Sequence, residues 1–467
     1  MKRKISNICG ICAGYVVSIA IQGGPTCAVL ANKITHVTVV DLDQGRIDAW
    51  ISTQLPIYEP NLPDVVELPR DGDDARKPNL FFSTDLDSAI ETADLIFRAV
   101  NTPTKTIGHG AGRASDLTYV ESAARRIAEI VVEQSTVPCG TANVLRDVFD
   151  SLARPFIRFE VLSKPKFLAE GTAIIDLLYP DRILIGSLNS QEALEASNAL
   201  AAVYGGWVPH CKIKTFSLWS CELAKLAANC MLAQRISSIS SLSTLCESMG
   251  TNIYELATTA GLDSRIGPKI LKDSAGFGEY CFRKDVPNLF YIAESHNLTE
   301  VAAYWRRVVD INKYQKNRFA KRIVNALNNT LANKEVAVLG FAYKKDDGDT
   351  RESAAISVVG QFIAERAHVA IYDPKVEKEQ ILRDLESDHL QRVVARYVTI
   401  CDNAYAACDK AAAVTLSRGI PWRLDWALVA GTMRRLQLVF DGRNIVEPAK
   451  LIRLGFRVHC VGKGVDL

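Results

Sequence analysis

The chain has 467 residues, of which 48% are hydrophobic, and carries a formal net charge of +2. This length and composition indicate a globular protein of about three domains with full hydrophobic cores. The near-neutral charge gives no reason to expect a nucleic acid or an acidic membrane as a partner.

The 12 cysteines are scattered along the chain, which favours reduced thiols in a cytoplasmic enzyme over a disulfide framework. Cys9 and Cys12 form a lone C-x-x-C pair without a second pair or a histidine cluster nearby, so we predict no metal site. The basic residues 1–4 followed by the apolar stretch 8–21 imitate a secretory signal. Cleavage there would remove the first strand of a nucleotide-binding fold, so we favour a cytoplasmic location and no membrane span.

The first region begins like a dinucleotide-binding fold. Residues 5–11 form an apolar run that predicts a strand, and Gly14 follows it at the place of a tight turn. Such a fold has another glycine about three residues later, but here residues 17–22 come before Gly23. Further strands are predicted at 36–43, 93–104, 130–138 and 158–165, and strands that alternate with helices indicate a parallel, doubly wound sheet.

The middle of the chain changes to helical periodicity. Residues 217–250 and 298–329 have apolar residues at helical spacing, and the second is typical of a helix that joins two domains. From Glu335 the strand pattern returns, with predicted strands at 335–344, 368–374, 411–417, 436–442 and 456–462. We therefore predict an α/β protein of two Rossmann-like, doubly wound domains joined by a central helical domain with a long connecting helix. The predicted boundaries are 1–215 for the first Rossmann domain, 216–330 for the helical domain and 331–467 for the second Rossmann domain.

Nine motifs occur in order along the chain: LPIYEPNL (55–62), VNTPTKT (100–106), KFLAEGTAI (166–174), ELAKLAAN (222–229), QRISSI (234–239), GFGEYCFRKD (276–285), GFAYKKDDGDTRES (340–353), IYDPKV (371–376) and FDGRN (440–444). With these motifs the chain resembles the UDP-glucose 6-dehydrogenases of the eukaryotic type, within the UDP-glucose/GDP-mannose dehydrogenase family. The resemblance implies NAD as cofactor, UDP-glucose as substrate and a homo-oligomer, either a dimer or a hexamer built as a trimer of dimers. The implied reaction is a four-electron oxidation to UDP-glucuronate through a cysteine thiohemiacetal and a thioester.

Asp41 ends a predicted strand, where a carboxylate accepts hydrogen bonds from the adenosine ribose and favours NAD over NADP. The resemblance implies the other roles. The residues implied to bind the cofactor, besides Asp41, are Gly14, Gly23, Arg46, Thr136, Glu170, Lys284 and Arg351. Those implied to bind the substrate are Phe167, Leu168, Lys225, Asn229, Arg265, Phe277, Gly278, Phe341, Lys344 and Arg443, with Lys344 also close to the cofactor and Arg265 reaching a neighbouring subunit's site.

Five residues are implied to act in catalysis. Cys281 matches the family's nucleophile, whose thiolate forms the covalent adduct. Lys225 and Asn229 lie four residues apart on a predicted helix and so share a face, from which they can stabilise an oxyanion. Asp285 matches the carboxylate that assists proton transfer, and Thr136 completes the set.

Several departures from the family pattern fall in the same region. Lys166 stands where the family has a glutamate, Glu279 and Tyr280 replace Gly-Ser before the nucleophile, and residues 17–22 are additional. The six additional residues are either translated non-coding sequence or a tolerated loop insertion. Two functions therefore remain open: an active UDP-glucose dehydrogenase, or a catalytically impaired homologue that acts as a UDP-sugar-binding or structural subunit. A dehydrogenase of another nucleotide sugar is a third option.

Overall fold

The structure is a computed structural model, and in it the chain divides into two compact units, Met1–Ala228 and Asn229–Leu467. Side chains are not described at 17–22, 130, 133, 150, 280 and 388. The described residues are 5–11, 17–33, 36–57, 59–99, 102–118, 130–134, 137, 139–151, 160–168, 171–278, 280–342, 350, 353–417 and 424–464.

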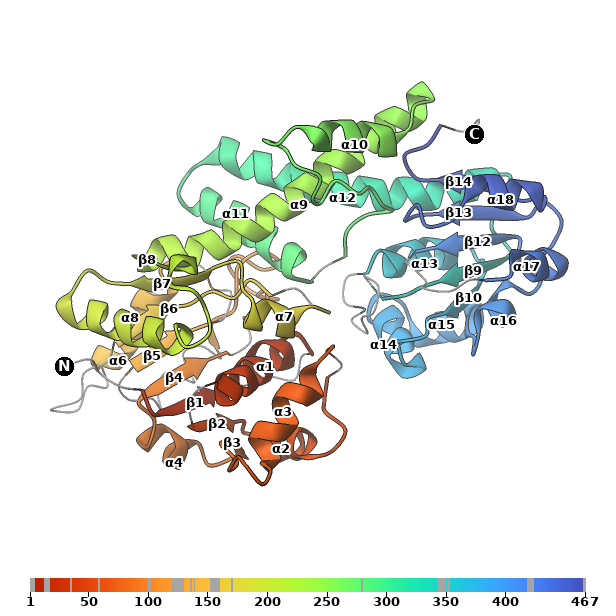
Figure 1. Ribbon diagram of the computed structural model, residues 1–467. Coiled ribbons are helices and arrows are strands. Elements are labelled where there is room, and N and C mark those ends of the chain that lie inside the picture. Colours follow the sequence, from red (N-terminus) through yellow and green to blue (C-terminus); the bar gives the residue numbers. More distant parts are fainter. Residues whose placement is uncertain are drawn as a thin grey trace. The chain divides into compact units, whose positions relative to one another are not determined.

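The first unit is built on an eight-stranded sheet with the order β3-β2-β1-β4-β5-β6-β7-β8 (Figure 1). Neighbouring strands are parallel except β6 and β7, which pair antiparallel through Ser163 and Gly186. The strands are β1 (Asn7–Ile11), β2 (His36–Val40), β3 (Leu80–Ser83), β4 (Leu95–Arg98), β5 (Ile130–Glu133), β6 (Glu160–Ser163), β7 (Ile183–Ser187) and β8 (Ile213–Ser217).

Helices pack on this sheet because their apolar faces are buried against the apolar strands. Val29 and Leu30 of α1 lie in a core with Val37 and Val39 of β2, all at most 2% exposed. The helices of this unit are α1 (Val17–Lys33), α2 (Gln44–Ile51), α3 (Leu62–Asp71), α4 (Leu86–Glu91), α6 (Thr141–Ser151), α7 (Ala173–Leu178) and α8 (Gln191–Tyr204), with a 3₁₀ turn at His210–Lys212.

The long helix α9 (Leu218–Met249) begins in the first unit and ends in the second. The helices that follow it are α10 (Ile253–Leu262), α11 (Tyr280–Ser295) and α12 (Thr299–Ala326). Apolar side chains of α9, α11 and α12, including Ala233, Phe282 and Val308, form one buried cluster. The described residues contain no helix that is both long enough and apolar enough to cross a membrane.

The second unit also contains a six-stranded sheet, in which every neighbouring pair is parallel and the order is β11-β10-β9-β12-β13-β14 (Figure 1). Its strands are β9 (Glu335–Leu339), β10 (His368–Tyr372), β11 (Val398–Ile400), β12 (Ala413–Leu416), β13 (Leu438–Asp441) and β14 (Arg457–Cys460). Its helices are α13 (Ala354–Ala364), α14 (Lys378–Asp388), α15 (Gln391–Tyr397), α16 (Ala404–Cys408), α17 (Trp426–Thr432) and α18 (Pro448–Arg453).

The predicted fold class, with two Rossmann-like sheets and helices between them in the sequence, is confirmed. The strands predicted from apolar runs are present, and the two long helices lie within one or two residues of the predicted starts and within three residues of the predicted ends. The predicted three-domain boundaries stay a prediction, since the two compact units divide the chain inside α9.

Candidate functional site

The predicted cofactor-binding carboxylate lies at the carboxyl end of β2. Asp41 accepts hydrogen bonds from Nη1 of Arg46 at 3.2 and 3.0 Å, and from the backbone N–H of Asp43 at 3.0 Å. Burial raises the pKa of Asp41 above its ordinary value, while the Asp43 hydrogen bond and the positive charge of Arg46 oppose that rise. The structure thus brings together two of the residues predicted to bind the cofactor. Carboxylate oxygens at this end of a parallel sheet are suited to ribose hydroxyls.

The first helix differs from the predicted turn. Gly14 lies outside the described residues, and Gly23 lies inside α1, which already begins at Val17. The additional residues 17–22 precede Gly23 in this helix, and its role in binding the cofactor stays a prediction. Gly24 allows α1 to pack closely against α2, since a Cβ there would come within 2.2 Å of the Trp50 ring.

The loop after β6 carries Phe167, whose ring lies between two cations. Cζ of Arg182 is 4.0 Å from the ring centroid, and Nζ of Lys225 is 5.3 Å from it. Both contacts have the geometry of cation–π interactions. The ring of Phe167 therefore packs against the ammonium of Lys225, one of the residues predicted to stabilise an oxyanion. The predicted cofactor-binding residue Glu170, on the same loop, lies outside the described residues.

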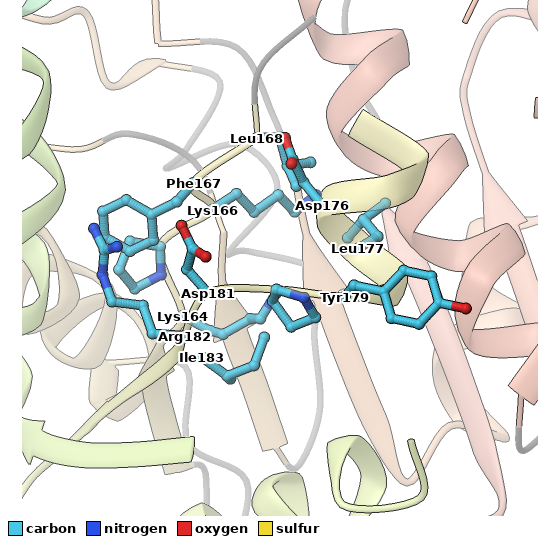
Figure 2. Close-up of a pocket in the computed structure, with 12 residues that line it drawn as sticks. Lys164, Lys166, Phe167, Leu168, Asp176, Leu177, Tyr179, Asp181, Arg182 and Ile183 are labelled. Atoms are coloured by element: carbon cyan, nitrogen blue, oxygen red, sulfur yellow. The ribbon is translucent and has the colours of Figure 1, made fainter. Parts of the chain in front are cut away.

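The same loop lines a small pocket of about 90 Å³ (Figure 2). Lys164 and Lys166 are buried, at 3% and 5% exposure, and Nζ of Lys164 lies 4.6 Å from the ring centroid of Tyr204. Burial, together with the positive charge of Lys166, holds the pKa of Lys164 well below its ordinary value. The remaining lining residues include Leu168, Asp176, Asp181 and Arg182.

In the second unit, a buried polar cluster surrounds the predicted catalytic carboxylate. Asp285 is fully buried, and its Oδ2 accepts a hydrogen bond from Nδ2 of Asn229 at 2.7 Å. Nζ of Lys284 lies 3.7 Å from Oδ1 of Asp285, and no hydrogen-bond donor among the described residues reaches that oxygen. Cys281 is half-buried and precedes Asp285 by four residues on α11, so both lie on one face of this helix.

Two loops of the second unit hold predicted substrate-binding residues. Asn312 of α12 clamps Phe277 by accepting its N–H at 2.8 Å and donating to its carbonyl at 2.9 Å, and Gly278 is buried beside it. Asp441 accepts the N–H of Arg443 at 2.9 Å. The sequence did not indicate Asn312 or Asp441 as site residues, although the motif FDGRN contains Asp441, because no pattern in it marks the polar side chains that bind the backbone.

The remaining predicted residues stay predictions. The ring of Phe341 is fully buried in the hydrophobic core, and its role in substrate binding is not tested by this burial. Arg265 is 88% exposed and pairs with Asp263 at 2.6 Å, so its reach into a neighbouring subunit stays a prediction. The predicted site residues outside the described part of the chain are Thr136, Lys344 and Arg351. The described residues hold no group of three or more His, Cys, Asp or Glu side chains that could bind a metal ion.

Three family domains match the chain in order. They are the NAD binding domain of the UDP-glucose/GDP-mannose dehydrogenase family at residues 6–208, its central domain at 219–314 and its UDP binding domain at 337–448. UDP-glucose 6-dehydrogenase of Bos taurus is 50% identical and covers 99% of this chain and 94% of its own length. UDP-glucose 6-dehydrogenase 3 of Arabidopsis thaliana is 48% identical, with 98% of both chains covered.

Solved structures give the same result for the fold. A UDP-glucose dehydrogenase from Pyrobaculum islandicum superimposes with a TM-score of 0.81 at 26% identity, covering 99% of this chain and 98% of the other. A UDP-D-ManNAc dehydrogenase from Pyrococcus horikoshii has a TM-score of 0.79 at 24% identity, covering 98% of this chain and 100% of the other, and this likeness concerns the fold alone.

Proposed function

Because the chain belongs to the UDP-glucose/GDP-mannose dehydrogenase family, we propose that it oxidises UDP-glucose to UDP-glucuronate with NAD as hydride acceptor. The observation that carries the proposal is the buried Asn229–Asp285–Lys284 cluster next to Cys281 on α11. Near-full-length relatives of plant and animal origin that bear this activity support it. The alternative of a catalytically impaired subunit gains no support from these relatives.

The residues at the carboxyl end of β2 fit the cofactor. Asp41 offers carboxylate oxygens for ribose hydroxyls, and Arg46 together with the Asp43 N–H fixes their direction. When bound, NAD supplies the hydride acceptor for two successive oxidations at C6 of the glucosyl unit. Gly24 lets α1 pack closely against Trp50 of α2, beside this site.

In the proposed mechanism, the aldehyde formed by the first oxidation is attacked by the thiolate of Cys281, giving a thiohemiacetal. Lys225, held on the ring of Phe167, and Asn229 stabilise the oxyanion of this adduct. Loss of the second hydride leaves a thioester, which water cleaves to the carboxylate and the free thiol. Asn229 fixes Oδ2 of Asp285, and Oδ1 is then the oxygen that orients the water or takes its proton.

The test is NADH formation, followed by its absorbance, after UDP-glucose is added to the purified protein with NAD. We expect two NADH for each UDP-glucuronate. Reduction of NAD by another nucleotide sugar but not by UDP-glucose would favour the third option raised by the sequence, a dehydrogenase of a different sugar.

We also propose a cytoplasmic homo-oligomer. The exposed faces of α9 and α10 support an interface between copies, because they carry large apolar side chains such as Met231, Met249 and Tyr254 at 64%, 66% and 72% exposure. None of the eleven described cysteines forms a disulfide bond, which is compatible with a reducing compartment. Light scattering of the purified protein tests the oligomer, and cell fractionation tests the compartment.

A further inference from the structure

In the first unit, the starts of two helices each donate backbone hydrogen bonds to a buried glutamate from a distant part of the chain. Oε2 of Glu222 accepts the N–H of Gly140 at 2.7 Å, and Oε1 accepts that of Ala142 at 2.9 Å, at the start of α6. Oε2 and Oε1 of Glu59 accept the N–H groups of Gly171 and Ala173 at 3.0 and 2.6 Å, at the start of α7. Each carboxylate therefore binds two backbone amides, and the two arrangements are alike.

Helix starts leave several backbone N–H groups without an intrahelical partner, and a side-chain oxygen next to the helix usually accepts one of them. At α7 the N-cap residue Thr172 makes no such hydrogen bond, and Glu59 supplies the acceptor from 112 to 114 residues away. Glu222 does the same for α6 from 80 to 82 residues away. A negative charge at this end of a helix is also favoured by the helix dipole.

Both glutamates are buried, at 3% exposure for Glu59 and 2% for Glu222. A buried carboxylate costs free energy unless charge-assisted hydrogen bonds satisfy it. Two such bonds to the backbone hold its position, and they equally hold the backbone that donates them. Each glutamate therefore fixes the position of the backbone at the start of one helix.

Those segments adjoin predicted site residues. The loop before α7 contains Phe167 and Leu168, and Phe167 is the residue on which Lys225 packs. Glu222 itself precedes Lys225 by three residues on α9, so one helix both holds the start of α6 and presents the ammonium.

We propose that Glu59 and Glu222 are positioning residues for the dehydrogenase reaction: each ties predicted site residues to the start of a helix through two backbone amides. This proposal rests on the proposed function. Glu59 holds the start of α7, which follows Phe167 and Leu168, so it acts on the binding of the sugar nucleotide. Glu222 ties α9, three residues before Lys225, to the start of α6, so it acts on the chemical step.

The test replaces each carboxylate by its near-isosteric amide, in Glu59→Gln and Glu222→Gln. One side-chain oxygen then becomes an NH₂ group, which faces a backbone N–H and cannot accept from it. The matched control is Glu67→Gln, since Glu67 is exposed on α3 in the same unit. Amide hydrogen exchange is followed on peptides that cover the starts of α6 and α7, and steady-state kinetics are measured well below the unfolding temperature of each variant.

We expect exchange to be at least about tenfold faster at the start of α7 in Glu59→Gln, and at the start of α6 in Glu222→Gln, with the other helix unchanged. Glu59→Gln should raise KM for UDP-glucose about tenfold, and Glu222→Gln should lower kcat about tenfold with KM within about twofold. If either variant fails to fold, Glu59→Asp and Glu222→Asp keep the charge but reach one amide, and smaller changes of the same kind are expected.

Unchanged exchange in the variants would overturn the proposal. So would faster exchange with kcat and KM within about twofold of Glu67→Gln, because the glutamates would then only stabilise the helices. Failure of the proposed function is a separate result, namely a wild-type protein that forms no NADH with UDP-glucose.

Discussion

Replacing Asp273 by asparagine should stabilise the second unit, and more so at alkaline than at acidic pH. Oδ1 of Asp273 accepts a hydrogen bond from Nδ2 of Asn444 at 3.1 Å, while its buried Oδ2 has no hydrogen-bond partner among the described residues. Burial raises the pKa of Asp273 to about 7; the negative charge of Glu247 adds to this, and the Asn444 hydrogen bond and Lys463 oppose it. The ionised form is therefore the unfavourable one in the fold.

The size of the effect follows from the pKa. An ordinary value of 3.8 and a value of about 7 in the fold differ by about three units, which corresponds to at most about 4 kcal/mol. The folded protein holds this proton more tightly than the unfolded chain. The contribution of Asp273 to stability is thus full below a pH of about 4, declines as the pH rises, and is lost above about 7.

The contribution of Asp273 to the free energy of unfolding is measured by calorimetric unfolding of the wild type and of Asp273→Asn, at a pH of about 4 and at a pH of about 8. Asparagine keeps an acceptor for Asn444 and carries no charge, so we expect little change at the lower pH and a gain of about 2–4 kcal/mol at the higher one. A gain of this size raises Tm by several degrees in a unit of this length. The control is the exposed Asp409→Asn. An equal gain in stability at both pH values, or no gain at the higher pH, would refute the reasoning.

Three further outcomes are expected. In a double-mutant cycle with Asn229→Ala and Asp285→Ala, the coupling energy should be about 1.5–3 kcal/mol, because the 2.7 Å hydrogen bond is buried and charged; simple additivity in thermal unfolding would contradict this. Cys281→Ser should stop turnover at the aldehyde, and unchanged production of UDP-glucuronate would exclude covalent catalysis by Cys281. Lys166→Glu should speed thioester hydrolysis, so that the initial burst of NADH in stopped-flow measurements shrinks and the steady rate rises; an unchanged time course, without an acyl adduct by mass spectrometry, would remove Lys166 from the mechanism.

The sequence predicted most of the strands from local apolar patterns. Runs such as the one that becomes β9 are buried almost throughout, and they are typical of strands of a parallel sheet. The strands β3, β7, β8 and β11 were not predicted. In β8, four of the five residues, from Lys214 to Ser217, are exposed at the edge of the sheet and show no apolar run, whereas β7 was missed although all five of its residues are buried. The antiparallel pairing of β6 with β7 depends on tertiary context, which strand patterns alone do not reveal.

At the site, the end of a predicted strand indicated Asp41, and the resemblance indicated Arg46, whose side chain pairs with it. Motif matching could not separate a residue that faces a ligand from one that faces the core, as at Phe341, whose ring is fully buried. It also passed over Glu59 and Glu222, although both letters lie in quoted motifs. Their partners are backbone amides that lie 80 to 114 residues away in the sequence. No spacing in the sequence marks such a contact.

The charge reversal at residue 166 has to be judged together with residue 164. The sequence places a lysine where the family has a carboxylate, which by itself adds a positive charge near Lys225. In the structure Lys166 lies beside a second buried lysine, Lys164, whose pKa is held well below its ordinary value by burial and by Lys166. Like charges in a buried site disfavour each other's ionised form, so burial and Lys166 together oppose positive charge on Lys164. Asp176 and Asp181 line the same pocket (Figure 2). We therefore expect Lys225, packed on Phe167, to be the cation that stabilises the oxyanion in the proposed mechanism.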